Sequence, residues 1–150
     1  MGIEIYLGAG LAIGLAGFGV SIGEAKLGSK SLEVVGKNPD LASYMRSLTI
    51  LGMALVESAA IYGLIVAILI LVTGDGITGM QALGAGLAIG LAGFGVGWGE
   101  GELVASSMDA ILRNPANKEA IRTNMILYLA LVESAAIYGL IIAILTIFVF

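Results

Sequence analysis

The sequence contains no cysteine and no histidine, and only 12% of its 150 residues are charged. The lack of cysteine excludes disulfides, thiol catalysis and thiolate metal sites, and the lack of histidine excludes imidazole acid–base chemistry. A soluble domain of this size carries about 25% charged residues. Because 59% of the residues are apolar and the mean hydropathy is +1.04, the composition is typical of a membrane protein.

Four long stretches of the chain carry almost no charge. Two of them have no charged residue, and each of the other two has a single glutamate. The four runs are residues 5–23, 47–74, 76–99 and 123–150, and the two glutamates are Glu57 and Glu133. A helix needs about 20 residues to cross the hydrocarbon core. The sequence therefore predicts an all-α membrane protein with four transmembrane helices.

The two halves of the chain repeat one another at an offset of 76 residues. GAGLAIGLAGFGV occupies residues 8–20 and 84–96, and ALVESAAIYGLI occupies residues 54–65 and 130–141. The repeat predicts two tandem helical hairpins, residues 1–75 and 76–150. Each hairpin has two spans, so both have the same orientation. This parallel duplication argues against the inverted repeats of many carriers and suits hairpins standing side by side in a ring.

All seven basic residues lie between the two spans of a hairpin. They are Lys26, Lys30, Lys37, Arg46, Arg113, Lys118 and Arg122. Lys and Arg mark the cytoplasmic side, so we expect the two polar loops in the cytoplasm and both termini outside. Asn38-Pro39 and Asn114-Pro115 are the expected turns, because the residue before proline avoids helical geometry.

An ionisable residue at mid-bilayer costs about 3 kcal/mol and is a functional site by default. Glu57 and Glu133 each incur this cost in identical surroundings. Glu24 precedes Pro39 by 15 residues and Glu57 follows it by 18, so the two acids have similar depth at about 1.5 Å per residue. Glu100 and Glu133 repeat this arrangement around Pro115. Each hairpin is therefore predicted to bring two carboxylates together.

Hydroxyl groups accompany the acids. Ser58 and Tyr62 share a helix face next to Glu57, and Ser134 and Tyr138 repeat them next to Glu133. Such oxygen-rich pockets suit a hard cation. Two close carboxylates in low dielectric do not both ionise, so one is expected to hold a proton. Three alternatives stay open: a structural interhelical hydrogen bond by Glu57 and Glu133, a position of Glu24 and Glu100 at the helix ends near the headgroups, and plain packing by the tyrosines.

Glycines crowd the first helix of each hairpin, at residues 8–23 and 84–101. Small residues four apart let helices approach closely in lipid. We interpret them as the inner wall of a narrow ring; close packing within one four-helix bundle is the alternative.

These features together resemble the proteolipid subunit, the c or K subunit, of rotary ATPases. The resemblance covers essentially the whole chain. It rests on the glycine-rich helices with Gly97-Trp98-Gly99-Glu100-Gly101, the loops Lys37-Asn38-Pro39 and Arg113-Asn114-Pro115, and the two Glu-Ser-Ala-Ala-Ile-Tyr segments. The fused double hairpin is more similar to the archaeal or vacuolar type than to the bacterial single hairpin.

The resemblance implies a homo-oligomeric ring in the plasma membrane that is not itself catalytic. It implies that Glu57 and Glu133 carry the ion, that a stator membrane subunit with an essential arginine releases it, and that the two Asn-Pro loops hold the central stalk. Ion flow would be coupled to rotation and so to ATP synthesis or hydrolysis. No cofactor, nucleotide or nucleic acid is expected on this chain.

Sodium-type members of this family supply ligands that match two sets of positions here. The sets are Glu24, the Leu55 carbonyl, Glu57, Ser58 and Tyr62, then Glu100, the Leu131 carbonyl, Glu133, Ser134 and Tyr138. Glutamate replaces the usual glutamine at Glu24 and Glu100, and Ala59 and Ala135 replace a threonine. The resemblance favours Na+ and leaves H+ open, with two ions per copy. A small ion-coupled secondary transporter and a non-transporting membrane assembly are the other hypotheses.

Overall fold

The computed structural model describes residues 2–150 and is helical throughout. Helices α1 (Ile3–Lys37), α2 (Ala42–Val56), α3 (Ser58–Thr73), α4 (Gly79–Arg113) and α5 (Lys118–Phe148) follow one another along the chain. Short 3₁₀ turns at Pro39–Leu41, Gly74–Gly76 and Pro115–Asn117 join them. The segments Ile3–Lys37, Pro39–Gly76, Gly79–Arg113 and Pro115–Phe148 are each long and apolar enough to cross a membrane. The prediction of an all-α protein with four spanning helices is confirmed.

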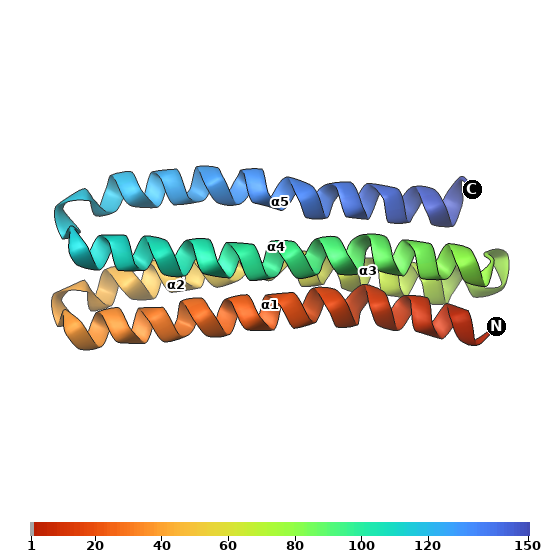
Figure 1. The fold of residues 1–150 in the computed structure, drawn as a ribbon, viewed down its shortest axis with the longest axis horizontal. Coiled ribbons are helices and arrows are strands. Elements are labelled where there is room, and N and C mark those ends of the chain that lie inside the picture. The colour runs from red at the N-terminus through yellow and green to blue at the C-terminus, as the bar shows by residue number, and fades with distance from the viewer. Residues whose placement is uncertain (1) are drawn as a thin grey trace.

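The helices run side by side along one long axis (Figure 1). Helices α1 and α4 run side by side, α2 and α3 lie behind them, and α5 runs along α4. Both termini and the link between α3 and α4 lie at one end, and the two Asn-Pro turns lie at the other. This end with the two Asn-Pro turns is called the loop end below.

Glycine sets the closeness of α1 and α4. A methyl group on Gly101 would overlap the Cα of Gly23, and one on Gly86 would overlap the carbonyl of Gly8. The two backbones are therefore in direct contact, as small residues permit between membrane helices. The repeat units meet in register, because Gly8 and Gly23 face glycines of the equivalent region of α4.

Polar contacts join the helices at both ends of the bundle. The Thr49 hydroxyl on α2 is hydrogen-bonded to the Ser31 hydroxyl on α1, with 2.6 Å between the two oxygens. The Tyr44 hydroxyl donates to the Lys118 carbonyl at 3.0 Å and thereby links the two loop regions. At the other end, the Gln81 amide donates to the Thr146 carbonyl at 3.1 Å. Each contact satisfies polar groups that would be costly to bury unpaired.

Helices α2 and α3 meet at Glu57 and form one span, because the Glu57 backbone keeps helical geometry, with φ −63° and ψ −27°. The Glu57 N–H still donates to the Met53 carbonyl at 2.9 Å, so the chain direction is kept. Helix α5 has the same local sequence and continues without a break past Glu133.

Candidate functional site

The second hairpin brings two carboxyl groups together in the middle of the bundle. Glu100 is 1% exposed on α4, on the buried stripe that also contains Val96 and Val104. Glu133 projects from α5, and its carboxyl lies close enough to the Glu100 carboxyl for the two groups to interact electrostatically. The helical period places residues 96, 100 and 104 on one face, which explains why Glu100 points inward with its apolar neighbours.

Helix α3 of the first hairpin completes this site. The Ser58 hydroxyl oxygen lies 2.7 Å from Glu133 Oε1 and 2.6 Å from the Leu55 carbonyl oxygen. The Tyr62 side chain lies within interaction range of Glu133 and Ser58. One carboxyl pair, one hydroxyl, one phenol and one carbonyl thus meet at the junction of α3, α4 and α5.

These groups line a pocket of about 390 Å³. Its polar lining is Ser58, Tyr62, Glu100 and Glu133, and its apolar lining is Leu55, Ile126, Leu129, Ala130 and Ile137. Both carboxyl oxygens of Glu100, and Glu133 Oε2, are buried without a hydrogen-bond partner. Unpaired buried charge is costly, so the pocket is suited to hold a proton or a cation.

The Ser58 hydroxyl restricts which protonation states fit. A hydroxyl has one hydrogen, so Ser58 donates either to Leu55 or to Glu133. The equivalent Ser134 donates to the Leu131 carbonyl at 2.7 Å. If Ser58 does the same, its 2.7 Å contact with Glu133 Oε1 requires a proton on Glu133, which then donates to the Ser58 hydroxyl oxygen. If Ser58 turns to Glu133, the Leu55 carbonyl is free to act as a ligand.

The first hairpin holds its own acid pair but not the rest of a site. The Glu24 and Glu57 carboxyls lie within interaction range of each other, and the Glu57 side chain is exposed. The residues equivalent to Leu55 and Tyr62 are on the other hairpin and face outward: Leu131 is 65% exposed and Tyr138 is 64% exposed. Each chain therefore contains one assembled site and two separated halves of another.

This arrangement corrects the expected grouping of ligands. Glu24, Glu57, Leu55 and Ser58 were expected together, as were Glu100, Glu133, Leu131 and Ser134, but Leu55 and Ser58 lie with Glu100 and Glu133. Successive residues of an α-helix point about 100° apart. Glu57 faces Glu24 on α1, whereas Ser58 faces α5, so neighbours in sequence serve different sites.

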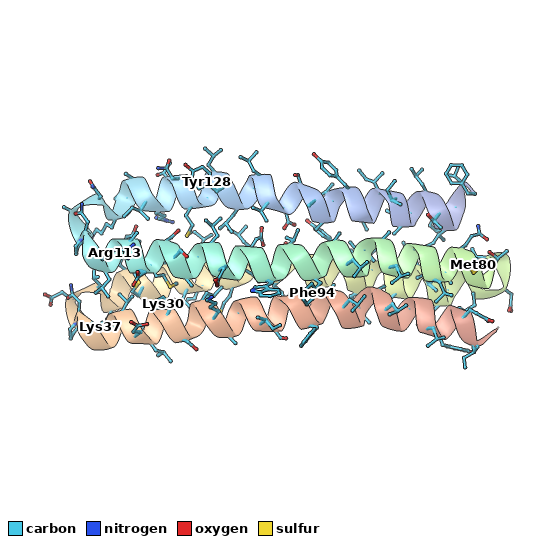
Figure 2. All side chains as sticks on the ribbon, viewed as in Figure 1. Lys30, Lys37, Met80, Phe94, Arg113 and Tyr128 are labelled. Atoms are coloured by element: carbon cyan, nitrogen blue, oxygen red, sulfur yellow. The ribbon has the colours of Figure 1, made fainter. Side chains whose placement is uncertain are left out.

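The expected loop residues lie together at the loop end, away from the pocket. They are Lys37, Asn38, Pro39, Arg113, Asn114 and Pro115; Lys37 and Arg113 are labelled in Figure 2. Asn38 Oδ1 accepts a hydrogen bond from the Asp40 N–H at 3.2 Å, which stabilises the first turn.

The sequence analysis did not predict the apolar residues that α5 contributes to the pocket. Ile126, Leu129, Ala130 and Ile137 lie three or four residues apart around Glu133, so the helical period alone could have found them. Within residues 2–150, no three carboxylates converge as at a multidentate metal centre. The pocket thus offers two carboxylates and neutral oxygens.

The fold and the pocket define a class: a double-hairpin membrane protein with paired carboxyl groups in its spanning helices. The sequence model of the ATP synthase C-subunit family matches the chain twice, at residues 7–70 and 83–146. The chain therefore belongs to the ATP synthase C-subunit family, in a duplicated form.

Individual relatives agree with this assignment. The chain is 36% identical over 139 residues to the K subunit of the A-type ATP synthase of Methanocaldococcus jannaschii, covering 93% of this chain and 59% of that protein. It is 50% identical over 70 residues to the ATP synthase c subunit of Dehalococcoides mccartyi, covering 47% of this chain and 92% of that protein. It is 41% identical over 69 residues to the ATP synthase c subunit of Petrotoga mobilis, covering 46% of this chain and 72% of that protein. The chain thus spans about three-fifths of the Methanocaldococcus relative and nearly all of the Dehalococcoides one.

Proposed function

We propose that this chain is the ion-carrying rotor subunit of a rotary ATPase or ATP synthase, and that Glu57 and Glu133 carry the ion. The proposal rests on the pocket in which Ser58 of one hairpin meets Glu100 and Glu133 of the other. The relatives are named as c and K subunits of ATP synthases. The chain is accordingly a membrane subunit, and ATP chemistry belongs to other subunits of the complex.

The separated half-sites support a homo-oligomeric ring. Glu24 and Glu57 lie toward one edge of the chain, while Leu131 and Tyr138 are exposed and Ser134 is half-buried on α5 at the other. If the hairpins of residues 1–75 and 76–150 act as equivalent repeat units, a second copy placed alongside repeats the contact between α3 and α5. Every glutamate pair then receives a serine, a tyrosine and a leucine carbonyl from the adjacent hairpin.

Small residues of α1 and α4 that make no contact within this chain are consistent with the same assembly. A methyl group on Gly10, Gly14 or Gly17 of α1, or on Gly95 or Gly99 of α4, would meet no atom within 4 Å. Free small-residue faces on both inner helices allow close packing against further copies. This supports alternating α1 and α4 helices around the ring.

We propose Na+ as the transported ion, with H+ as the alternative. Glu100, Glu133, Ser58 and the Leu55 carbonyl present oxygen atoms to one pocket, and oxygen is the ligand type that a hard cation prefers. One bound Na+ with one proton shared by the two carboxyls leaves the pocket neutral. Two protons leave it neutral as well, which is why the two ions compete.

Carbodiimide labelling of the purified assembly tests the ion. We expect millimolar Na+ to protect Glu57 and Glu133 from modification, and to protect them more strongly as the pH rises. The reason is that protons and Na+ occupy the same carboxyl oxygens, so removing protons favours Na+. Mass spectrometry of the labelled peptides gives the modified fraction at each acid.

The same titration with K+ in place of Na+ is the control for ionic strength. Labelling that follows pH but is indifferent to Na+ contradicts the sodium assignment and identifies a proton rotor with the same acids.

Paired serine variants test whether each site is built from two hairpins. In Ser58→Ala, we expect Na+ protection to weaken at Glu133 and to persist at Glu57, because the hydroxyl contacts Glu133. A hydrogen bond to a charged group contributes about 1.5–3 kcal/mol, so the apparent Na+ affinity falls on the order of tenfold or more.

Ser134→Ala is the matched variant. In this variant we expect Na+ protection to weaken at Glu57 of the adjacent copy and to persist at Glu133. If each serine instead affects the glutamate next to it in sequence, the sites are built within single hairpins.

Orientation and partners follow from the charges at the loop end. We propose that the Lys37-Asn38-Pro39 and Arg113-Asn114-Pro115 loops face the cytoplasm and hold the central stalk, with the termini outside the plasma membrane. A stator membrane subunit is proposed to bring an arginine to the exposed Glu57 and to Glu133. Its positive charge would displace the bound ion before the site returns to lipid.

A further inference from the structure

The contact between the two hairpins of one chain is a template for the contact between neighbouring copies in the proposed ring. Repeat-equivalent residues lie 76 positions apart. Each contact within the chain should therefore recur between copies, with the residue of the first hairpin replaced by its equivalent in the second, and the reverse. This inference rests on the proposed ring, because it concerns the surface that one copy presents to the next.

The glycines of α1 and α4 follow this rule. Apart from Gly36 near the loop end, the glycines of these helices at which an added methyl group would meet no atom within 4 Å are Gly10, Gly14, Gly17, Gly95 and Gly99. In the same order, their repeat equivalents are Gly86, Gly90, Gly93, Gly19 and Gly23. At each of these equivalents the added methyl group would overlap atoms of the other hairpin. The uncrowded positions are thus the ones that the same packing would fill between copies.

One ion pair is its own repeat equivalent. Lys26 of α1 pairs with Glu102 of α4 within the chain, and the two positions are 76 residues apart. The rule therefore places Glu102 beside Lys26 of the next copy as well. Their side chains are 47% and 46% exposed, so each has an open side for a second partner of opposite charge.

At one position the two contacts cannot have the same shape. Within the chain, Gly52 of α2 faces Val104 of α4, and a methyl group on Gly52 would lie 2.8 Å from a Val104 Cγ atom. The repeat equivalents of this pair are Tyr128 of α5 and Gly28 of α1. The glycine is therefore on α2 in the internal contact, but on the glycine-rich helix α1 in the contact between copies.

Tyr128 faces a groove that is open in the single chain. It is 49% exposed on α5, and the groove between α4 and α5 has a volume of about 240 Å³. The lining residues are Leu103, Ser106, Ser107, Ala110, Ile121, Asn124, Met125 and Tyr128. In the first hairpin the equivalents of Leu103 and Asn124 are Leu27 and Leu48, which are buried in one cluster with Val104 of the second hairpin. The groove beside Tyr128 is thus the place where the next first hairpin is expected.

Gly28 has the room to receive a large side chain. It is partly exposed on α1, and a methyl group there would contact only the terminal methyl group of Met53, at 3.3 Å. Met53 belongs to the same hairpin, and its unbranched side chain adapts readily. Helices α1 and α5 lie at opposite edges of the chain (Figure 1), so Tyr128 and Gly28 can meet only between copies.

We propose that the Tyr128 ring of each copy packs onto Gly28 of the next copy and anchors the contact between them. The ring fills the space that a side chain at position 28 would otherwise occupy. Like hairpins fit badly at this point, because Gly52 opposite Gly28 leaves a void and Tyr128 opposite Val104 overfills the contact. The pair thus favours a first hairpin beside every second hairpin.

Cysteine pairs test the contact directly, because the sequence contains no cysteine of its own. A Cβ added at Gly52 would lie 3.6 Å from the Val104 Cβ, within the range of about 3.5–4.5 Å that a disulfide spans. We therefore expect the full chain with Gly28→Cys and Tyr128→Cys, oxidised in the membrane, to give a ladder of covalent oligomers on a non-reducing gel. Gly52→Cys with Val104→Cys is the matched control, and its disulfide should form within single chains.

The mass of the native assembly separates failure of this contact from failure of the ring. A multi-copy assembly without covalent oligomers overturns the contact, leaves the ring standing, and identifies Tyr128 as a residue that faces lipid. A single copy overturns both. A disulfide between positions 28 and 128 of the same chain also contradicts the proposal.

Exchanging the two residue sizes tests whether the Tyr128 ring fills the space at Gly28. We expect Tyr128→Gly to lower the temperature at which the detergent-solubilised assembly dissociates, because it leaves a void. Gly28→Val should lower it too, because the valine meets the ring. The double variant reproduces the valine–glycine pair of the internal contact, so it should dissociate at a higher temperature than either single variant.

The cost of a glycine within α5 is present in both Tyr128→Gly and the double variant, so it cancels when these two are compared. A double variant that is no more stable than Tyr128→Gly alone contradicts the contact, because two residues that touch are not additive. These outcomes do not depend on which ion the chain carries.

Discussion

Replacing Glu57 and Glu133 together by glutamine is expected to abolish ion-coupled ATP turnover while leaving the assembly intact. Glutamine has nearly the same shape as a protonated glutamate, so the packing of the pocket is kept. It carries no exchangeable charge, so no ion can be taken up and released.

Each single replacement should also stop turnover. In a rotor every site passes the stator in turn, so one site that cannot load halts the rotation of the others. The measurement is ATP hydrolysis by the reconstituted complex with and without an ion gradient, together with tracer ion uptake. Glu4→Gln, which removes an exposed acid near the N-terminus, is the matched control and should retain full activity.

Retention of coupled transport by Glu133→Gln would show that one acid per chain suffices. It would contradict the proposal that the two hairpins are equivalent ion-carrying units. Loss of assembly in the double variant would show a structural role for the acids, as in the interhelical hydrogen-bond hypothesis.

Replacing Gly23 by leucine is expected to prevent the two hairpins from docking. A methyl group at this position would overlap the carbonyl of Gly97 on α4, and the facing Gly101 is in direct contact with the Gly23 backbone. Overpacking a well-filled interior costs about 1–3 kcal/mol where side chains can move aside. Here the opposing atoms are backbone, which cannot move aside without separating α1 from α4.

Size and thermal stability of the detergent-solubilised assembly measure this effect. Gly101→Leu is expected to behave in the same way, because it meets the same contact from the other helix. Gly36→Leu is the matched control, since a side chain there meets no atom within 4 Å. Normal assembly of Gly23→Leu would contradict the direct backbone contact between α1 and α4.

The prediction of paired acids illustrates how far helical geometry alone can reach. Counting residues from Pro39 and Pro115 placed Glu24 near Glu57 and Glu100 near Glu133, and the structure brings both pairs within interaction range. Counting succeeds here because an unbroken helix converts residue number into depth at a constant rise.

Assigning the neutral ligands to those pairs needed more than depth. Ser58 lies next to Glu57 in sequence but contacts Glu133, and Leu55 and Tyr62 follow it. Depth is a property of one helix, whereas contact depends on which way each side chain points and on which helix stands opposite. The repeat conceals this distinction, because Ser134 lies at the same depth as Ser58 but on a different helix.

The sequence by itself determined the number of spanning helices, their duplication in one orientation, and the depth of the acids. These properties follow from local rules: charge-free length, the rise of a helix and the identity of the repeats. Only the tertiary structure decided that the assembled pocket joins both hairpins, and that aromatic and charged residues of α1 and α4 share one face. Each of these depends on which helices, far apart in sequence, lie next to one another and which way their side chains point, and the close glycine contact between α1 and α4 is part of that arrangement.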